Sequence, residues 1–160
     1  MNNVFLILGG NLGERDKNLA EAVKEIGKSA GIIKRSSAIY ETEPWGVENQ
    51  PNYYNQVVEI LTDHDAESLM NILLNIEKNM GRSRTGKYDA RNIDIDILFF
   101  NDEIISSNTL TIPHPRLHER RFVLMPMNEI APEFVHPTLN RSISQLLKET
   151  ADNGKVSLAG

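Results

Sequence analysis

The sequence predicts an α+β fold of the ferredoxin-like class, because its main elements run β-α-β-β-α-β over residues 1–100. Residues 4–8 are a short apolar run that ends at a Gly-Gly-Asn turn, as a buried strand does. Two later stretches, 14–28 and 65–80, repeat apolar side chains at helical spacing. Residues 91–100 alternate polar and apolar side chains, which is typical of a strand. This order predicts a βαββαβ core with an antiparallel sheet, helices on one face and a C-terminal extension.

The first half of the core supplies one helix and two further strands. The strands are expected over 32–40 and 53–61, after the helix at 14–28. Between them, residues 41–52 contain two prolines and a glycine, which predicts a long loop. The apolar stripe of the helix consists of Leu19, Ala22, Val23 and Ile26.

The second half of the core begins with another helix. Asp65 is a suitable N-cap for a helix that runs to about Met80. A basic loop with two glycines follows over 81–90 and leads into the strand at 91–100. The apolar stripe of this helix, which we assign to the core, consists of Leu69, Ile72, Leu73 and Ile76.

Beyond residue 100 the expected structure is less regular. Short strands are expected at 103–105 and 109–112, followed by mostly irregular chain with three prolines. A last short helix is expected over 142–149, and the tail from residue 152 should be frayed. Since no repeat or linker interrupts the chain, residues 1–160 are expected to form a single domain.

Composition restricts the possible partners. The 160-residue chain has 40% hydrophobic and 24% charged residues, as ordinary globular proteins do. Its net charge of -5 argues against a general polyanion-binding surface, so no nucleic-acid partner is expected. The absence of cysteine excludes disulfides and thiolate metal sites and fits a reducing compartment. The short N-terminal apolar run suits a strand rather than a signal peptide or membrane span, so we expect a cytoplasmic location without a membrane partner. Separately, the chain is expected to act as a monomer.

Two carboxylates stand out in the last core strand. Asp94 and Asp96 share one of its faces, with their Cα atoms roughly 6.6–7 Å apart. Carboxylates at this spacing can converge on a hard cation such as Mg²⁺, which favours phosphate partners. The alternative is a half-buried strand that turns its polar face to solvent. The opposite face should pack on the helices, leaving the aspartates on the open side of the sheet; it carries Ile93, Ile95, Ile97 and Phe99.

Cations precede and follow this strand. Arg82, Arg84, Lys87 and Arg91 lie in the loop before it, where they could neutralise phosphate charge while the aspartates hold the metal. The alternative is a solvated basic loop held by surface ion pairs, each worth about 0–1 kcal/mol. The second basic cluster consists of His114, Arg116, His118, Arg120 and Arg121.

Other candidate residues are aromatic, amide and histidine side chains. Tyr53 and Phe122 are either core aromatics or the two walls of a cleft for a flat heterocycle, whose edge Asn55 would read. Among the histidines, His114 could bind a phosphate or lie at the surface, whereas His118 is expected at the surface. His64 and His136 are expected to be structural.

Taken together, these residues match a known family over nearly the full length of the chain. The matching stretches are GGNL at 9–12, TEPWG at 42–46, QPNYYN at 50–55, Glu77, GRSR at 81–84, RNIDIDIL at 91–98, PH at 113–114, RRF at 120–122 and EIAP at 129–132. In these stretches the chain resembles the 6-hydroxymethyl-7,8-dihydropterin pyrophosphokinases of folate biosynthesis. The resemblance implies the ferredoxin-like fold and transfer of a pyrophosphoryl group from ATP to the pterin hydroxymethyl group. It also implies release of AMP and use of two Mg²⁺ ions.

The resemblance also implies a role for each matching residue. Asp94 and Asp96 match the metal-binding aspartates, and Arg82 and Arg91 match arginines that act on the phosphates. The positions that match the pterin site are Thr42, Tyr53, Asn55 and Phe122. The positions that match the surroundings of ATP are Glu77, Arg84, Ile97, Thr111, His114 and Arg120.

Two other classes of function are compatible with the predicted fold. A ferredoxin-like RNA-binding module would need aromatic side chains on the open sheet face and a basic surface. Here that face carries two aspartates and the chain is acidic. A nucleotide-binding regulatory domain would bind ATP without turning it over. An assay for AMP distinguishes such a domain from a pyrophosphokinase.

Overall fold

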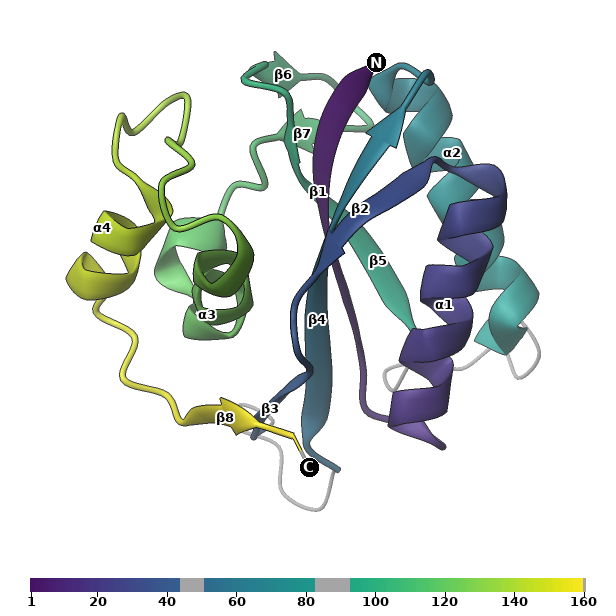
Figure 1. Ribbon diagram of the computed structural model, residues 1–160, viewed down its shortest axis with the longest axis horizontal. Coiled ribbons are helices and arrows are strands. Elements are labelled where there is room, and N and C mark those ends of the chain that lie inside the picture. Colours follow the sequence, from purple (N-terminus) through teal and green to yellow (C-terminus); the bar gives the residue numbers. More distant parts are fainter. Residues whose placement is uncertain (44–50, 83–92, 160) are drawn as a thin grey trace.

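The computed structural model describes residues 1–43, 51–82 and 93–159 (Figure 1). This α+β structure also has a kinked turn over Lys78–Arg82, where Met80 and Gly81 leave helical geometry, and a 3₁₀ turn over Leu117–Glu119. The strands are β1 (Asn2–Gly10), β2 (Ile32–Ser36), β3 (Tyr40–Thr42), β4 (Tyr53–Thr62), β5 (Asp94–Phe100), β6 (Ile105–Ser106), β7 (Thr111–Ile112) and β8 (Val156–Leu158). The helices are α1 (Arg15–Ser29), α2 (Ala66–Glu77), α3 (Arg121–Ile130) and α4 (Ile143–Glu149).

The main sheet is antiparallel, as predicted. Its strand order is β5-β1-β4-β3-β8, and β2 pairs with the C-terminal half of β4, beyond the part that pairs with β3. The strand expected over 32–40 is interrupted, because β2 pairs with β4 as far as Ser36 and β3 resumes the pairing at Tyr40. β6 and β7 form a separate two-stranded sheet.

Helices cover both faces of the main sheet. Figure 1 shows α1 and α2 on one side of it and α3 and α4 on the other. The alternation of β1 explains this arrangement, because Leu6 and Leu8 pack with the first helix pair whereas Phe5 and Ile7 pack in the cluster under α3. The core helices do share one face, but the prediction that the opposite face stays open is wrong.

The helix α3 replaces chain that was expected to be irregular. Pro126 lies inside it, and a proline at such a position removes a backbone hydrogen bond and costs about 3 kcal/mol in an isolated helix. Tertiary packing outweighs that cost, because the helix buries an apolar stripe against the sheet. The stripe consists of Val123, Leu124, Met127 and Ile130.

The packing of β5 differs from the prediction at one residue. Phe99 lies in the cluster under α3, away from Ile93, Ile95 and Ile97. The cause is a register shift against β1, where Leu6 pairs with Ile97 but Phe5 pairs with Phe99. The extra residue reverses the alternation of the strand.

The ends of two other elements are also informative. Asp65 accepts a hydrogen bond from the Ser68 backbone N–H at 2.8 Å, which confirms the predicted N-cap of α2. The tail predicted to be frayed instead forms β8, which pairs with β3. No helix in the described part of the chain has the length and apolar composition needed to cross a bilayer.

Candidate active site

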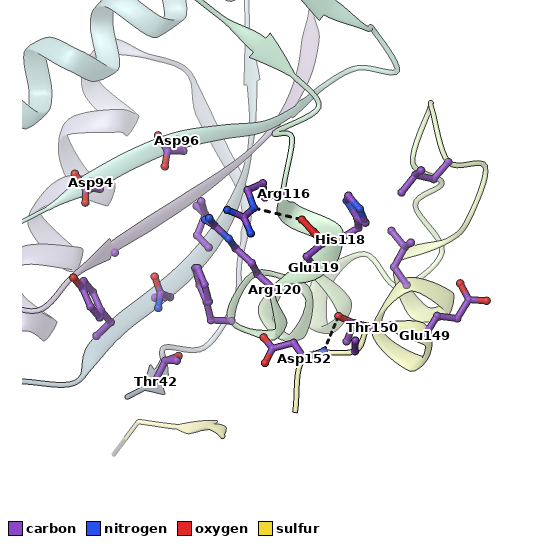
Figure 2. Close-up of a pocket in the computed structure, with 18 of the residues that line it drawn as sticks. Thr42, Asp94, Asp96, Arg116, His118, Glu119, Arg120, Glu149, Thr150 and Asp152 are labelled. Carbon is purple, nitrogen blue, oxygen red and sulfur yellow. Dashed lines mark hydrogen bonds and ion pairs between the residues drawn. The ribbon is translucent and has the colours of Figure 1, made fainter. Parts of the chain in front are cut away.

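A cavity of about 1140 Å³ lies between the main sheet and the C-terminal part of the chain. Its walls come from β1, β3, β4 and β5 on one side and from α3, α4 and the segments beside them on the other (Figure 2). We call it the sheet-side cavity. A volume of this size is ample for a small organic substrate.

The four residues predicted to bind the pterin all line the sheet-side cavity. Thr42 on β3 pairs with Tyr53 on β4, which places Asn55 two residues further along the same strand. Phe122 comes from the first turn of α3, on the other side of the cavity. Tyr53 and Phe122 thus line the same cavity from different elements.

Two polar groups in this cavity are positioned for a ligand. The Asn55 side chain is buried, and the backbone of β1 passes so close that a Cβ atom on Gly9 would lie 2.3 Å from Asn55 Oδ1. Only glycine at this position leaves room for the amide. Thr42 also lines this cavity, and its Oγ1, which is itself shielded from solvent, has no hydrogen-bond partner among the described residues.

A second cavity, of about 390 Å³, lies on the other side of the aspartates. We call it the nucleotide-side cavity. Four residues predicted to surround ATP line it, namely Glu77, Ile97, Thr111 and His114.

Asp94 and Asp96 line both cavities. Figure 2 shows the two side chains following one another along β5. Two carboxylates suit Mg²⁺, which takes oxygen ligands and keeps several waters or phosphate oxygens in its coordination sphere. Within the described ranges no group of three or more His, Cys, Asp or Glu side chains is placed to hold a metal ion.

The surroundings of His114 keep its ring neutral at physiological pH. Burial lowers the pKa of His114, and the Arg120 cation lowers it further, whereas the Asp96 carboxylate opposes both effects. Its Nδ1 accepts a long hydrogen bond, 3.5 Å, from the Arg116 backbone N–H. The proton of the neutral ring is therefore assigned to Nε2, and this N–H can donate a hydrogen bond to an anionic oxygen.

Glu77 is held at the junction of α2 and β5. Its buried carboxylate accepts a hydrogen bond of 2.6 Å from the Ile95 backbone N–H, between the two aspartates. This contact ties the strand that carries the aspartates to the end of α2.

Of the arginines predicted to act on ATP, only Arg120 has a side chain among the described residues, and it lies in the sheet-side cavity. Arg120 lines the sheet-side cavity, with its guanidinium 5.7 Å from the centre of the Phe122 ring. Arg84 and Arg91 lie outside the described residues, as does the side chain of Arg82. The described part of the site thus contains the aspartates, the aromatic pair and His114, together with Arg120.

The comparison with known protein families fits this geometry. The model of the 7,8-dihydro-6-hydroxymethylpterin-pyrophosphokinase (HPPK) family matches residues 5–132. The chain belongs to the HPPK family. The match includes every residue that the sequence proposes for the site.

Individual HPPK relatives extend the match over most of the chain. A 2-amino-4-hydroxy-6-hydroxymethyldihydropteridine pyrophosphokinase of Bacillus subtilis is 41% identical, over 81% of this chain and 79% of its own length. Its counterpart in Haemophilus influenzae is 35% identical over 99% of both chains. The folic acid synthesis protein FOL1 of Dictyostelium discoideum is 36% identical over 97% of this chain but 23% of its own length. This chain therefore spans less than a quarter of that longer relative.

Solved HPPK structures share the fold. The Plasmodium falciparum HPPK-DHPS structure with pteroate has a TM-score of 0.76 and 20% identity, over 92% of this chain and 42% of that one. At this identity the likeness concerns the fold alone.

Sequence reasoning missed part of the cavity wall, and most of that part lies outside the HPPK match. Arg141, Glu149 and Asp152 line the sheet-side cavity, and all three follow residue 132. Asp152 fixes the tail there, since its carboxylate accepts from the backbone N–H groups of Arg121 and Gly154. No sequence motif marks these residues, whereas Gly9 belongs to the matched GGNL stretch.

Proposed function

We propose that this chain transfers a diphosphate group from ATP to the hydroxyl of 6-hydroxymethyl-7,8-dihydropterin, yielding the pterin diphosphate and AMP in tetrahydrofolate biosynthesis. The observation that carries the proposal is the shared position of Asp94 and Asp96, which line two cavities at once. A transfer reaction needs donor and acceptor on the two sides of one charge-stabilising centre. Membership of the HPPK family supports the same reaction.

The sheet-side cavity is the proposed pterin site. Tyr53 and Phe122 would stack on the two faces of the ring, while Asn55 and Thr42 would hydrogen-bond its edge. A buried amide held in a fixed orientation discriminates strongly against rings that lack matching donors and acceptors. The specificity of the enzyme for its acceptor would therefore come from this cavity.

The nucleotide-side cavity is the proposed position of the ATP phosphates. Asp94 and Asp96 would hold two Mg²⁺ ions there, which when bound neutralise phosphate charge and polarise the phosphoryl oxygens. His114 would donate a hydrogen bond from its Nε2–H to a phosphate oxygen, and Arg120 would approach from the pterin side. Glu77, Ile97 and Thr111 would contact the rest of the nucleotide, and Arg82, Arg84 and Arg91 are proposed to act on the phosphates.

The proposed chemistry is a direct in-line displacement. The pterin hydroxyl oxygen forms a bond to the β-phosphorus of ATP while the bond from that phosphorus to the α,β-bridging oxygen breaks. AMP leaves with the bridging oxygen, and the hydroxyl proton passes to solvent. The protein contributes position and charge neutralisation, without a covalent intermediate.

The strand order and the positions of α1 and α2 support assignment of residues 1–100 to the ferredoxin-like class, with the remaining chain as an extension. We propose that residues 1–160 act as a single domain, as a cytoplasmic monomer that binds only small molecules. The cluster between α3 and the sheet argues against an RNA-binding module, because that module needs this face exposed.

An assay of products tests the proposed function. The chain is incubated with ATP, Mg²⁺ and 6-hydroxymethyl-7,8-dihydropterin, and the nucleotides are separated. AMP formed only with pterin and Mg²⁺ present is the expected result, and EDTA should abolish it. ADP would mean transfer of a single phosphoryl group, and bound but unreacted ATP would favour the regulatory domain.

A further inference from the structure

Glu129 occupies an unfavourable place for a negative charge. It lies in the last turn of α3, where the helix carbonyls carry partial negative charge. Its carboxylate is compensated by donors from another part of the chain. The Ala38 backbone N–H lies 3.1 Å from both carboxylate oxygens, and the Tyr40 hydroxyl lies 2.7 Å from Oε1.

The donor on Ala38 exists because the sheet is interrupted there. Ser36 pairs with Val58 but Tyr40 pairs with Asn55, so three residues on one side face two on the other. Ser37 fills part of the gap by donating its backbone N–H to the Val57 carbonyl. The backbone N–H of Ala38 is directed instead to Glu129, which supplies an acceptor that the sheet does not.

The donor on Tyr40 connects Glu129 to the pterin side of the site. The Tyr40 side chain is only 8% exposed and its residue pairs directly with Asn55. Two residues later, Thr42 pairs with Tyr53. Burial and the adjacent Glu129 carboxylate raise the pKa of Tyr40 to about 12, so the hydroxyl remains a donor at physiological pH.

The other end of the tie is α3 itself. Phe122 precedes Glu129 by seven residues, which is about two helical turns and brings both residues to the same side of the helix. A bond from Glu129 to the sheet therefore restrains the helix that presents Phe122.

We propose that Glu129 is a positioning residue for the pterin side: by tying α3 to the connection between β2 and β3, it sets the spacing of Phe122 from Tyr53 and Thr42. Glu129 does not line the cavity and acts only through these residues. The inference rests on the proposed function, because it concerns affinity for the pterin.

The test compares Glu129→Ala with Glu129→Gln and with wild type. AMP release gives kcat and both KM values, and pterin fluorescence gives its Kd at a saturating unreactive ATP analogue. Glu129→Ala should raise KM and Kd for the pterin about tenfold while kcat and KM for ATP change less than about twofold. Glu129→Gln should lie within about threefold of wild type, because its amide oxygen still accepts a hydrogen bond.

Two further variants separate positioning from loss of stability. Tyr40→Phe, which leaves the bond from Ala38, should give an intermediate pterin Kd. Glu133→Ala removes an exposed carboxylate just beyond α3 and should leave the pterin Kd unchanged. Thermal unfolding confirms that each variant is folded at the assay temperature.

The outcomes distinguish this inference from the proposed function. A wild-type chain that releases no AMP contradicts the proposed function. An unchanged pterin Kd in Glu129→Ala, or equal losses for pterin and ATP, contradicts the positioning role. If the pterin Kd of Glu129→Gln is as high as that of Glu129→Ala, the hydrogen bonds from Ala38 and Tyr40 are not what positions α3.

Discussion

The two cavities that meet at Asp94 and Asp96 are built in different ways. The walls of the sheet-side cavity come from segments as distant as Gly9 and Asp152, held together by sheet pairing and by the tail. The described residues that line the nucleotide-side cavity all fall between positions 70 and 115 of the chain. Tertiary structure thus shapes the proposed pterin site, whereas local chain shapes the proposed phosphate site. Substitutions on one side should therefore leave ligand affinity on the other side nearly unchanged.

Substitution of Asp94 or Asp96 should affect both sides of the site, because these residues line both cavities. We expect Asp94→Asn or Asp96→Asn to lower kcat by about 10²–10³-fold or more, because each removes a negative charge from the proposed metal site. Both variants should remain folded, since an amide has nearly the shape of a carboxylate. Steady-state AMP release measures the effect.

The matched control is Asp102→Asn, an exposed acid in the turn after β5, which should behave as wild type. Near-normal turnover in either aspartate variant would remove the metal role from these residues.

On the nucleotide side, His114→Ala should raise KM for ATP by about 10–100-fold, because a hydrogen bond to a charged oxygen is worth about 1.5–3 kcal/mol. The Kd for the pterin alone should change little. His114→Gln should recover part of the loss, since its amide N–H can replace the Nε2–H. If instead the pterin Kd rises equally, the two cavities are coupled more tightly than their construction indicates.

On the sheet side, Phe122→Ala should raise the pterin Kd by up to about tenfold, because an aromatic stacking pair is worth about 0.5–1.5 kcal/mol. KM for ATP should stay within about twofold, since Phe122 lines only the sheet-side cavity. Phe122→Tyr keeps the ring and serves as the control. A larger effect on ATP than on pterin would contradict the assignment of this cavity.

The sequence was most informative where a signal is local. The alternation around Asp94 and Asp96 predicts β5, and the N-cap Asp65 predicts the start of α2. The main sheet follows from the order of these elements. The resemblance to the HPPK family supplied four candidate residues for the pterin, and the structure brings them to one cavity.

The errors concern features fixed by distant parts of the chain. Pro126 predicts irregular structure, but burial against the sheet stabilises α3 around it. The side on which Phe99 packs depends on a register shift with β1. Asp152 is held at the cavity by the backbone N–H of Arg121, and no local sequence pattern marks that contact. Each of these outcomes is decided by a partner that periodicity within one segment does not contain.

The smallest expected effect is a pH dependence of stability that comes from His136, on the sheet side of the site. His136 is buried, and its Nδ1 accepts hydrogen bonds from the backbone N–H groups of Thr138 and Leu139. Burial lowers the pKa of His136 below its ordinary value of 6.5, and the nearby His118 lowers it further. Leu139 lines the sheet-side cavity, so this histidine supports the wall of the proposed pterin site.

Because the folded state disfavours the protonated ring, the unfolded chain binds the proton more readily. The stability that neutral His136 contributes is therefore complete above pH 6.5 and is lost as the pH falls through the lower pKa of the folded state. The urea concentration at the midpoint of wild-type unfolding should decrease as the pH is lowered from about 7.5 to 5.5. His136→Gln should make the midpoint depend less on pH. His64→Gln, at a partly exposed histidine, should retain it. Equal pH dependence in wild type and His136→Gln would mean that the wall next to Leu139 does not depend on the neutral ring.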